Sequence, residues 1–341
     1  MSEGRSITSL DVAKRAGVSQ SAVSRVFTPG ASASAKTAEK VKAAAAELGY
    51  RPNVLARAMV SGKSRIIGLV VAYLDNYFYP EAMELLSNAL QERGYHVLIF
   101  MATQTAGNID DVVEEILDYQ VDGIVAASVA LSSNLSARCR AADVPIVLFN
   151  RRQDDSDMWS VTSDNFGGGR KAAQHFLECG YDRIGYIAGW EGASTQRDRE
   201  AGFRAGLEAA NRTLHCRDVG NFRMDEAANA ARRLLRQDEP PDAIFVANDH
   251  MAFAVMDVAR SEFDLKVPED LGIMGYDDVP VASWPAYDLT TIRQRARRMV
   301  SRTVDILLNE IEGYPGDPMQ ETICGPLITR GSTRLQKGRR S

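Results

Sequence analysis

The chain has 341 residues, of which 45% are apolar and 25% charged, and its formal net charge is −5. This length and composition are typical of a globular protein with two or three domains and a large core. No stretch approaches the roughly 18 uninterrupted apolar residues of a membrane-spanning helix, and the N-terminus lacks the apolar core of a signal peptide. We therefore exclude a membrane role and expect a cytoplasmic protein.

Charge is distributed unevenly along the chain. Residues 1–65 contain 11 Lys and Arg against 4 Asp and Glu, a net charge of +7, which leaves a net charge of −12 for the rest. A small basic segment attached to an acidic body suits binding of a nucleic-acid phosphate backbone by that segment alone. A solvated basic face without a partner is the alternative.

Residues 8–27 read as two short helices joined by a tight turn. Thr8 can cap the first helix, and Asp11 three residues later completes a capping box. Gly17 can adopt the backbone angles that turn the chain, and Ser19 can cap the second helix. The apolar residues of the second helix form a buried side. Its outer face then consists of Gln20, Ser21, Ser24 and Arg25.

Hydrogen-bonding side chains near the start of an exposed helix are the means by which a helix-turn-helix reads base edges in the major groove. An ordinary helical hairpin with a polar outer face is the alternative. A third helix is predicted from Ser34 to Gly49. Residues 52–62 then lie between a proline and a glycine and can form a helix of about two turns, which is marginal in water by itself. An alanine-rich linker is the other interpretation of that segment.

From residue 65 onward, short apolar stretches alternate with amphipathic helices. The predicted strands are residues 66–74, 96–101, 123–127, 145–149, 183–188, 243–247 and 272–276. The predicted helices are residues 80–93, 110–119, 168–179, 198–210, 225–236 and 249–262. This alternation predicts parallel sheets covered by helices on both faces, and the span is long enough for two of them. A cleft between two such lobes, at the carboxyl ends of the strands, is the natural ligand site.

The sequence contains no recognisable catalytic motif. Residues 167–169 are three glycines but do not form GxGxxG, and GxxxxGK[ST] is absent. The four histidines and four cysteines are scattered, without metal-ligand spacing. We therefore expect no cofactor, no metal and no enzymatic activity.

The run DVAKRAGVSQSAVSRV at residues 11–26 resembles the DNA-binding headpiece of the LacI family of bacterial transcriptional regulators. The similarity continues through residues 34–37, 41, 48–50, 52–53, 56–57 and 67–68. It implies an all-α helix-turn-helix headpiece with a hinge helix, followed by an α/β two-lobed periplasmic-binding-protein-like domain with two parallel Rossmann-like sheets. The residues that the resemblance assigns to DNA are Thr8, Ser19, Gln20, Ser21, Ser24, Arg25, Ser34, Asn53, Ala56, Arg57 and Met59.

The resemblance also implies how these domains work together. A homodimer would place two headpieces on pseudo-palindromic operator DNA, with two hinge helices paired over the minor groove. Met59 stands where the family has a leucine that wedges between base pairs, and methionine can serve as such a wedge. A small effector bound between the lobes would control operator binding, most often in this family as a repressor.

Short polar and aromatic segments after the predicted strands are similar to the family's effector cleft. The residues implied are Phe78, Tyr79, Asn150, Asp164, Arg199, Phe222, Asn248, Asp277 and Gln294. Such donors and acceptors set around aromatic faces suit a sugar or a related metabolite. Helix capping is an alternative role for Asp164, Asp198 and Asp249. For Arg199, an ion pair with a carboxylate is the alternative to effector binding.

We expect three regions: a headpiece at residues 1–51, a hinge at 52–64, and an effector-binding and dimerisation domain at 65–341. Within the last, the N-lobe is expected at 65–162 plus 292–322, and the C-lobe at 163–291 plus 323–335. The tail after Thr333 is basic and lacks leucine heptads, so we expect it to be disordered and to form no tetramerising coiled coil. A periplasmic-type solute-binding protein is the rival interpretation, but it would need an export signal and would have no use for residues 1–62.

Overall fold

A computed structural model of the chain describes residues 7–27, 31–51, 63–72, 74–102, 106–129, 133–153, 158–314, 316–317 and 319–335. The chain forms two compact units, Met1–Arg65 and Ile66–Ser341. Each unit has a hydrophobic core of its own. The hinge segment 52–62, with the predicted DNA contacts Asn53, Ala56, Arg57 and Met59, lies outside the described residues, as does the tail from residue 336.

The N-terminal unit is a three-helix module made of α1 (Ser9–Ala16), α2 (Gln20–Phe27) and α3 (Ala35–Leu48). Thr8 and Asp11 form the predicted capping box of α1, and Gly17 ends that helix with a φ of 67°. Ser34 caps α3, which ends at Gly49 in the same left-handed conformation. The three helices pack around Val12, Ala13, Val23, Val41, Ala44 and Ala45.

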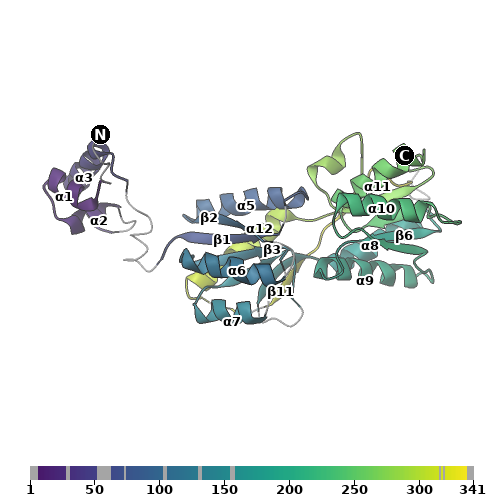
Figure 1. Cartoon of the computed structure of the whole chain (residues 1–341), viewed down its shortest axis with the longest axis horizontal. Coiled ribbons are helices and arrows are strands. Elements are labelled where there is room, and N and C mark those ends of the chain that lie inside the picture. The colour runs from purple at the N-terminus through teal and green to yellow at the C-terminus, as the bar shows by residue number, and fades with distance from the viewer. Residues whose placement is uncertain are drawn as a thin grey trace. The chain divides into compact units, whose positions relative to one another are not determined.

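The first lobe of the larger unit is built on a parallel six-stranded sheet in the order β11-β5-β4-β3-β1-β2. Its strands are β1 (Ile66–Val71), β2 (His96–Met101), β3 (Gly123–Ala127), β4 (Ile146–Phe149), β5 (Trp159–Ser163) and β11 (Gln320–Ile323). Helices α5 (Phe78–Glu92) and α12 (Ala296–Ile311) cover one face (Figure 1). Helices α6 (Ala106–Asp118) and α7 (Ser133–Ala141) cover the other. β1 is buried along its whole length, as expected of a strand covered on both faces.

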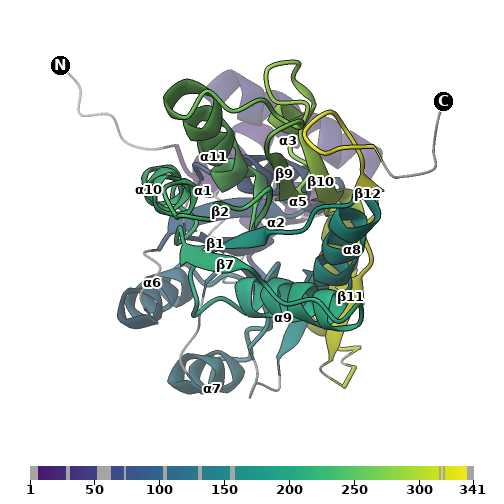
Figure 2. The same cartoon turned by 90° about the vertical axis from the view of Figure 1, so that its right-hand side faces the viewer.

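The second lobe repeats this plan with the order β12-β10-β9-β8-β6-β7, in which only β12 is antiparallel among the described pairings. Its strands are β6 (Ile184–Ala188), β7 (Cys216–Val219), β8 (Ala243–Val246), β9 (Gly272–Asp277), β10 (Thr290–Arg293) and β12 (Leu327–Ile328). Its helices are α8 (Asn165–Glu178), α9 (Ser194–Glu208), α10 (Met224–Leu235), α11 (Asp249–Glu262) and the short 3-10 helix η1 (Pro280–Ser283). The pairs α8–α9 and α10–α11 lie on opposite faces (Figure 2). One parallel sheet and one sheet that is parallel except for β12, both covered by helices, confirm the predicted α/β fold of the two lobes.

The chain passes between the lobes three times: from β5 into α8, from β10 into α12, and from β11 into β12. These crossings place the carboxyl ends of strands from both sheets opposite one another. Direct contacts join the two edges. Asn76, just after β1, donates from Nδ2 to Asp277 Oδ2 at the end of β9, with a separation of 3.4 Å.

Two of the three proposed aspartate caps are absent. Helix α9 begins at Ser194, so Asp198 lies inside it and pairs with Arg152 instead. Asn248 caps α11, because its Oδ1 accepts from the Met251 amide at 3.0 Å, which leaves Asp249 free for another role. Asp164 does cap α8, with Oδ1 accepting from the Gly167 amide at 2.9 Å.

Candidate functional site

The outer face of α2 presents the polar residues that the sequence assigns to DNA. Ser19, Gln20, Ser21, Ser24 and Arg25 are all exposed. The hydrogen bonds of these side chains are exposed, so water or a partner can replace them. Arg25 Nε lies 3.4 Å from the Ser21 carbonyl oxygen, Ser19 Oγ lies 2.9 Å from Ser21 Oγ, and Gln20 Nε2 donates to Ser9 Oγ of α1 at 2.9 Å. Thr8 and Ser34 are exposed as well, although each also caps a helix. These side chains can therefore bind a partner without any unfolding of the three-helix module.

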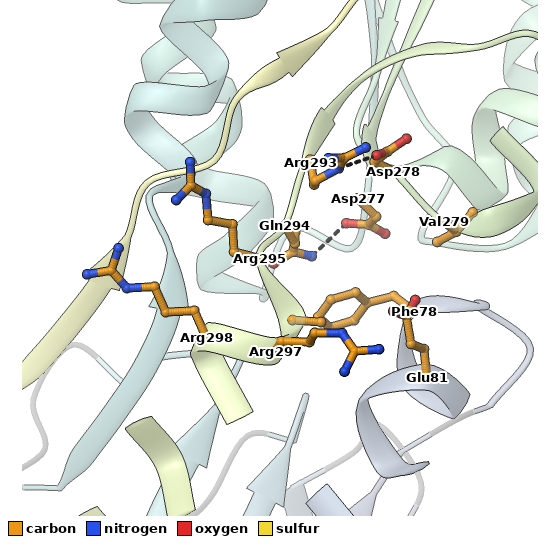
Figure 3. Close-up of a pocket in the computed structure, with 11 residues that line it drawn as sticks. Phe78, Glu81, Asp277, Asp278, Val279, Arg293, Gln294, Arg295, Arg297 and Arg298 are labelled. Carbon is orange, nitrogen blue, oxygen red and sulfur yellow. Dashed lines mark hydrogen bonds and ion pairs between the residues drawn. The ribbon is translucent and has the colours of Figure 1, made fainter. Parts of the chain in front are cut away.

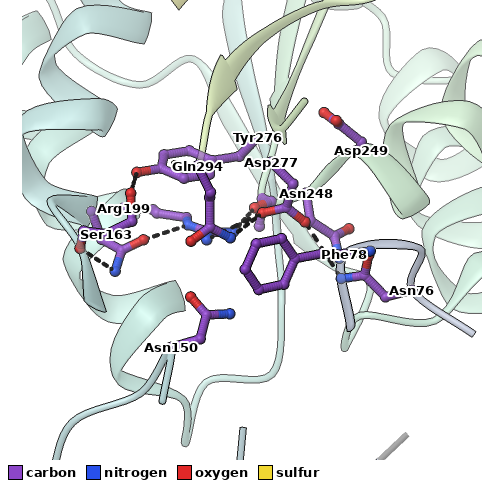
Figure 4. A network of polar contacts seen from close by, with 12 residues as sticks. Asn76, Phe78, Asn150, Ser163, Arg199, Asn248, Asp249, Tyr276, Asp277 and Gln294 are labelled. Atoms are coloured by element: carbon purple, nitrogen blue, oxygen red, sulfur yellow. Dashed lines mark hydrogen bonds and ion pairs between the residues drawn. The ribbon is translucent and has the colours of Figure 1, made fainter. Parts of the chain in front are cut away.

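In the two-lobed unit, the candidate site is a buried polar network centred on Arg199 (Figure 4). The side chain is 2% exposed. Its Nε donates to Asn165 Oδ1 at 2.8 Å, and Nη1 donates to the Ala247 carbonyl at 2.6 Å. Nη2 lies 3.4 Å from Asp277 Oδ1, and the guanidinium stacks on the Tyr276 ring at 3.7 Å from its centroid. The expected alternative, pairing with a carboxylate, is therefore also present.

Close packing of α8 on α9 fixes the position of Arg199. A Cβ atom on Gly169 would lie 2.1 Å from the Arg199 carbonyl oxygen, and one on Gly202 would lie 2.0 Å from the Phe166 carbonyl oxygen. Only glycine allows two helix backbones to approach so closely. The glycine run that fails to match a nucleotide-binding motif thus serves helix packing at the site.

The network contains two buried carboxyl groups, those of Asp277 and Asp249. Asp277 accepts from Gln294 Nε2 at 2.7 Å, besides Asn76 and Arg199. Burial raises the pKa of Asp277, and the Arg199 cation opposes that rise. Asp249 accepts from Thr291 Oγ1 at 2.6 Å and from the Val279 amide at 3.0 Å. Burial and the charge of Asp277 raise the pKa of Asp249 to about 8. Burial therefore favours the protonated form of both carboxyl groups, and the pKa of about 8 keeps Asp249 protonated near neutral pH.

Aromatic side chains form the apolar wall of the network. Phe78 and Tyr79 are both buried, and the Phe78 ring stacks on Phe149 at a centroid distance of 6.3 Å. Phe222 is 6% exposed and has a φ of 61°. A Cβ atom on Gly189 would lie 2.2 Å from the Phe222 ring, so the ring occupies space that only a glycine leaves.

Several buried polar atoms at the strand ends have no hydrogen-bond partner among the described residues. They are Ser128 Oγ, Asn150 Oδ1, Asn248 Nδ2, Gln294 Oε1 and all three guanidinium nitrogens of Arg151. Buried polar groups are nearly always paired, so these atoms are candidates for contacts with a bound ligand. The set contains donors and acceptors, and a hydroxylated ligand can satisfy both.

The backbone at these strand ends is also unusual. Ser128 has a φ of 59°, Asn150 of 63° and Asp278 of 59°. Residues other than glycine avoid this left-handed region unless their surroundings hold them there, and such residues gather at binding sites.

The structure brings together seven of the nine predicted effector residues in or beside this network, namely Phe78, Tyr79, Asn150, Arg199, Asn248, Asp277 and Gln294. Phe222 lies against Gly189, just after β6. Asp164 differs, because one of its oxygens caps α8 and the other lies 3.4 Å from Cys324 Sγ. The prediction missed several members: Asn76, Ser128, Arg151, Asn165, Asp249 and Tyr276. Ser128 and Arg151 follow strands at the same edge, so the rule that identified Asn150 could have found them.

A cavity of about 430 Å³ borders the network where the chain returns from β10 to the first lobe (Figure 3). Phe78, Asp277 and Gln294 contribute to its lining, and the rest comes largely from the arginine-rich run 293–298. Arg293 is held by Asp278, with Nε 2.5 Å from Oδ2. Within the described residues no group of His, Cys, Asp and Glu side chains could hold a metal ion, and no helix there is long and apolar enough to span a membrane.

Both parts of the chain are similar to known protein families. Residues 8–53 match the family described as bacterial regulatory proteins, lacI family, and residues 173–333 match a periplasmic binding protein-like domain. A relative in Haemophilus influenzae (strain PittEE), named HTH-type transcriptional repressor PurR, is 31% identical over 88% of this chain and 90% of its own length. A protein of the same name in Vibrio vulnificus (strain CMCP6) is 28% identical over 95% of this chain and 98% of its own length.

Among solved structures, a lac repressor dimer bound to operator and the anti-inducer ONPF superposes with a TM-score of 0.88 at 28% identity, covering 97% of this chain and 100% of that one. A complex of the transcriptional regulator CelR with cellobiose gives a TM-score of 0.73 at 30% identity, covering 96% and 99%.

A helix-turn-helix module followed by a two-lobed α/β domain with a polar cleft defines a DNA-binding transcriptional regulator controlled by a small ligand. The chain belongs to the lacI family of bacterial regulatory proteins.

Proposed function

We propose that the chain is a repressor whose two paired headpieces read a pseudo-palindromic operator through the outer face of α2, and whose cleft binds a hydroxylated metabolite. One headpiece contacts too few base pairs to find an operator among genomic competitors, so two must act together. The repressor role is supported by the names of the relatives.

A surface for the second copy is present on the first lobe. β2 is an edge strand, and its Ile99 and Met101 side chains are 54% and 52% exposed. An edge strand with large exposed apolar residues is an aggregation hazard unless something covers it. We propose that a second copy of the chain covers this strand and so forms a homodimer.

The ligand proposal rests on buried polar atoms that have no hydrogen-bond partner among the described residues. Asn150 Oδ1 and Gln294 Oε1 can accept from ligand hydroxyls, and Asn248 Nδ2 can donate to a ligand oxygen. Ser128, Asn150 and Asn248 follow strands of both lobes, so one ligand touching all three favours one lobe arrangement over others. Ligand binding then changes operator affinity through the lobe whose first strand follows the headpiece in the chain, with a coupling of about 1–3 kcal/mol.

A paired ligand screen tests this function. Wild type and Asn248→Ala are screened by thermal shift against sugars, sugar acids and phosphorylated sugars, and each hit is then added to an operator-binding titration. We expect at least one compound to raise the melting temperature of wild type, to do so much less in Asn248→Ala, and to change operator affinity. Exposed Gln174→Ala is the control and should respond like wild type. Hits that stabilise the protein without any effect on DNA binding would contradict the regulatory role, and turnover of a hit would contradict the expectation that the chain is not an enzyme.

A further inference from the structure

Arg151 is a buried cation for which the described residues supply no hydrogen-bond acceptor. It follows β4, is 4% exposed, and its Nε, Nη1 and Nη2 have no hydrogen-bond partner in the described part of the chain. Its guanidinium lies over the Trp190 ring, 5.4 Å from the centroid. Arginine is almost never fully buried unless it is paired, because losing water without gaining acceptors is costly. An aromatic face offsets part of that cost but supplies no acceptor for five N–H groups.

A small cavity adjoins this guanidinium. Its volume is about 100 Å³, and residues of both lobes line it: Leu148 and Arg151 from the first, and Gly192, Ser194 and Arg197 from the second. Such a space holds about three waters, at roughly 30 Å³ each, or one carboxylate or phosphate group. The cavity is therefore large enough for the missing acceptor and too small for a whole sugar.

Among the described residues that line the cavity, the charged side chains are all arginines. The N-terminus of α9 lies at its edge, and no side chain caps that helix end at Ala193. Arg152 also lines the cavity, but Asp198 neutralises it in an ion pair of 2.9 Å. Asp198 is thereby already engaged. A helix N-terminus together with an unpaired arginine is the environment that favours an oxyanion.

Trp190 is held in place to support Arg151. A Cβ atom on Gly192 would lie 2.4 Å from the indole ring, so the ring fits against the turn only because residue 192 is glycine.

We propose that this cavity is an anion subsite of the effector cleft, in which Arg151 binds a carboxylate or phosphate group carried by the effector. Asn150, the neighbouring residue, offers an unpartnered acceptor for a hydroxyl of the same molecule. The effector class is thus a polyhydroxylated compound with one anionic end, either a sugar acid or a phosphorylated sugar. This inference rests on the proposed function, since it concerns the ligand of that cleft. Because the cavity is lined from both lobes, the bound anion also holds the lobes together.

Two variants of the full-length chain test the subsite. Arg151→Gln removes the charge, and Arg151→Lys keeps the charge but loses the planar fork. Arg212→Gln is the control, because Arg212 forms an exposed ion pair with Asp182 in the second lobe, outside the residues that line this cavity. Melting temperatures are measured at constant ionic strength with chloride, acetate or inorganic phosphate, and with glucose, gluconate or glucose 6-phosphate. Dissociation constants are measured for the anionic hits of the ligand screen.

We expect acetate or phosphate to raise the melting temperature of wild type and Arg212→Gln above its value in chloride, and to have no such effect in Arg151→Gln. Arg151→Gln should weaken an anionic effector about ten- to a hundredfold, as expected for a lost charge-assisted hydrogen bond. Arg151→Lys should weaken it less. Gluconate and glucose 6-phosphate distinguish a carboxylate from a phosphate as the preferred group, and each should stabilise wild type more than glucose does.

The proposal is overturned if no anion stabilises wild type more than Arg151→Gln. It is also overturned if neutral sugars are the only compounds that bind, or if Arg151→Gln binds anionic hits as tightly as wild type does. In these last two cases the proposed regulatory function would stand, because ligands would still bind and could still alter operator affinity. Failure of every ligand to change operator binding would instead refute the proposed function.

Discussion

Arg199 joins the polar groups of the cleft, and its removal should affect stability and ligand response together. Arg199→Ala leaves Asp277 buried without its cation, so we expect a loss of about 3–5 kcal/mol in the free energy of unfolding of the two-lobed unit, together with loss of effector response. Operator binding should persist at temperatures where the variant remains folded. Arg232→Ala is the matched control, because its ion pair with Glu262 is partly exposed and should contribute no more than about 1 kcal/mol. Denaturant titration and operator binding measure both quantities, and an Arg199→Ala protein that still responds to effector would exclude Arg199 from the site.

Asp249 should make stability depend on pH. Its folded pKa of about 8 lies above the ordinary aspartate value of about 3.9 that it has in the unfolded chain. Between these values the folded state binds more protons, so the stabilising contribution is complete below about pH 4 and is lost as pH rises through about 8. The wild-type free energy of unfolding should therefore fall more steeply from pH 5 to pH 8 than that of Asp249→Asn, by a slope of up to about 1 kcal/mol per pH unit. Equal slopes, measured by urea titration across that range, would mean that Asp249 is ionised in the folded protein.

Sequence reasoning identified the site residues that follow predicted strands but could not identify those defined by long-range contact. Asn150, Asn248 and Asp277 belong to the first kind, since a polar residue after a buried strand is visible in the sequence. Asn165 and Asp249 belong to the second. Asn165 holds Arg199 from 34 positions away, and Asp249 contacts Thr291 from 42 positions away. The neighbouring sequence does not distinguish such residues from residues that cap helices.

At the scale of elements, the glycines between α8 and α9 set the geometry of the cleft. Gly169→Ala would force the two helices apart, and overpacking of this kind costs about 1–3 kcal/mol. Because Arg199 lies at the contact, effector affinity should fall as well, while headpiece folding should not change. Calorimetric ligand titration and thermal unfolding measure the two effects. Gln174→Ala on the exposed side of α8 is the control, and a Gly169→Ala protein with unchanged effector affinity would show that helix spacing does not position the site.

The buried strands were predictable because they read as continuous apolar runs. β5, β7, β10 and β11 were missed because they are short and contain several polar or charged residues, as in Thr290–Arg293. β12 was missed because it has only two residues, Leu327–Ile328. Helix α12 was also missed, although Met299, Val300, Val304 and Leu307 recur along it at helical spacing. Its many arginines concealed that pattern.

For the whole molecule, the exposed apolar edge of β2 predicts how the chain assembles. Replacing both Ile99 and Met101 by Asp should convert a dimer into a monomer, because two charges would be buried without partners at the interface. Paired headpieces bind far more tightly than single ones, so operator affinity should also fall by at least about a hundredfold. Met224→Asp alters an exposed apolar residue on α10 and should leave both properties unchanged. Analytical ultracentrifugation reports the mass, and a double variant that remains dimeric would place the interface elsewhere.

The central claim is that the exposed face of α2 reads DNA sequence and that a ligand in the cleft controls the reading. The most direct measurement is a fluorescence-anisotropy titration of the full-length protein against a duplex selected from a random pool and against its scrambled version, with and without a saturating ligand. We predict strong preference for the selected duplex, a change in that preference with ligand, and loss of discrimination at one base position in Arg25→Ala, worth about 1–3 kcal/mol. Equal affinity for both duplexes, with or without ligand, would contradict the account.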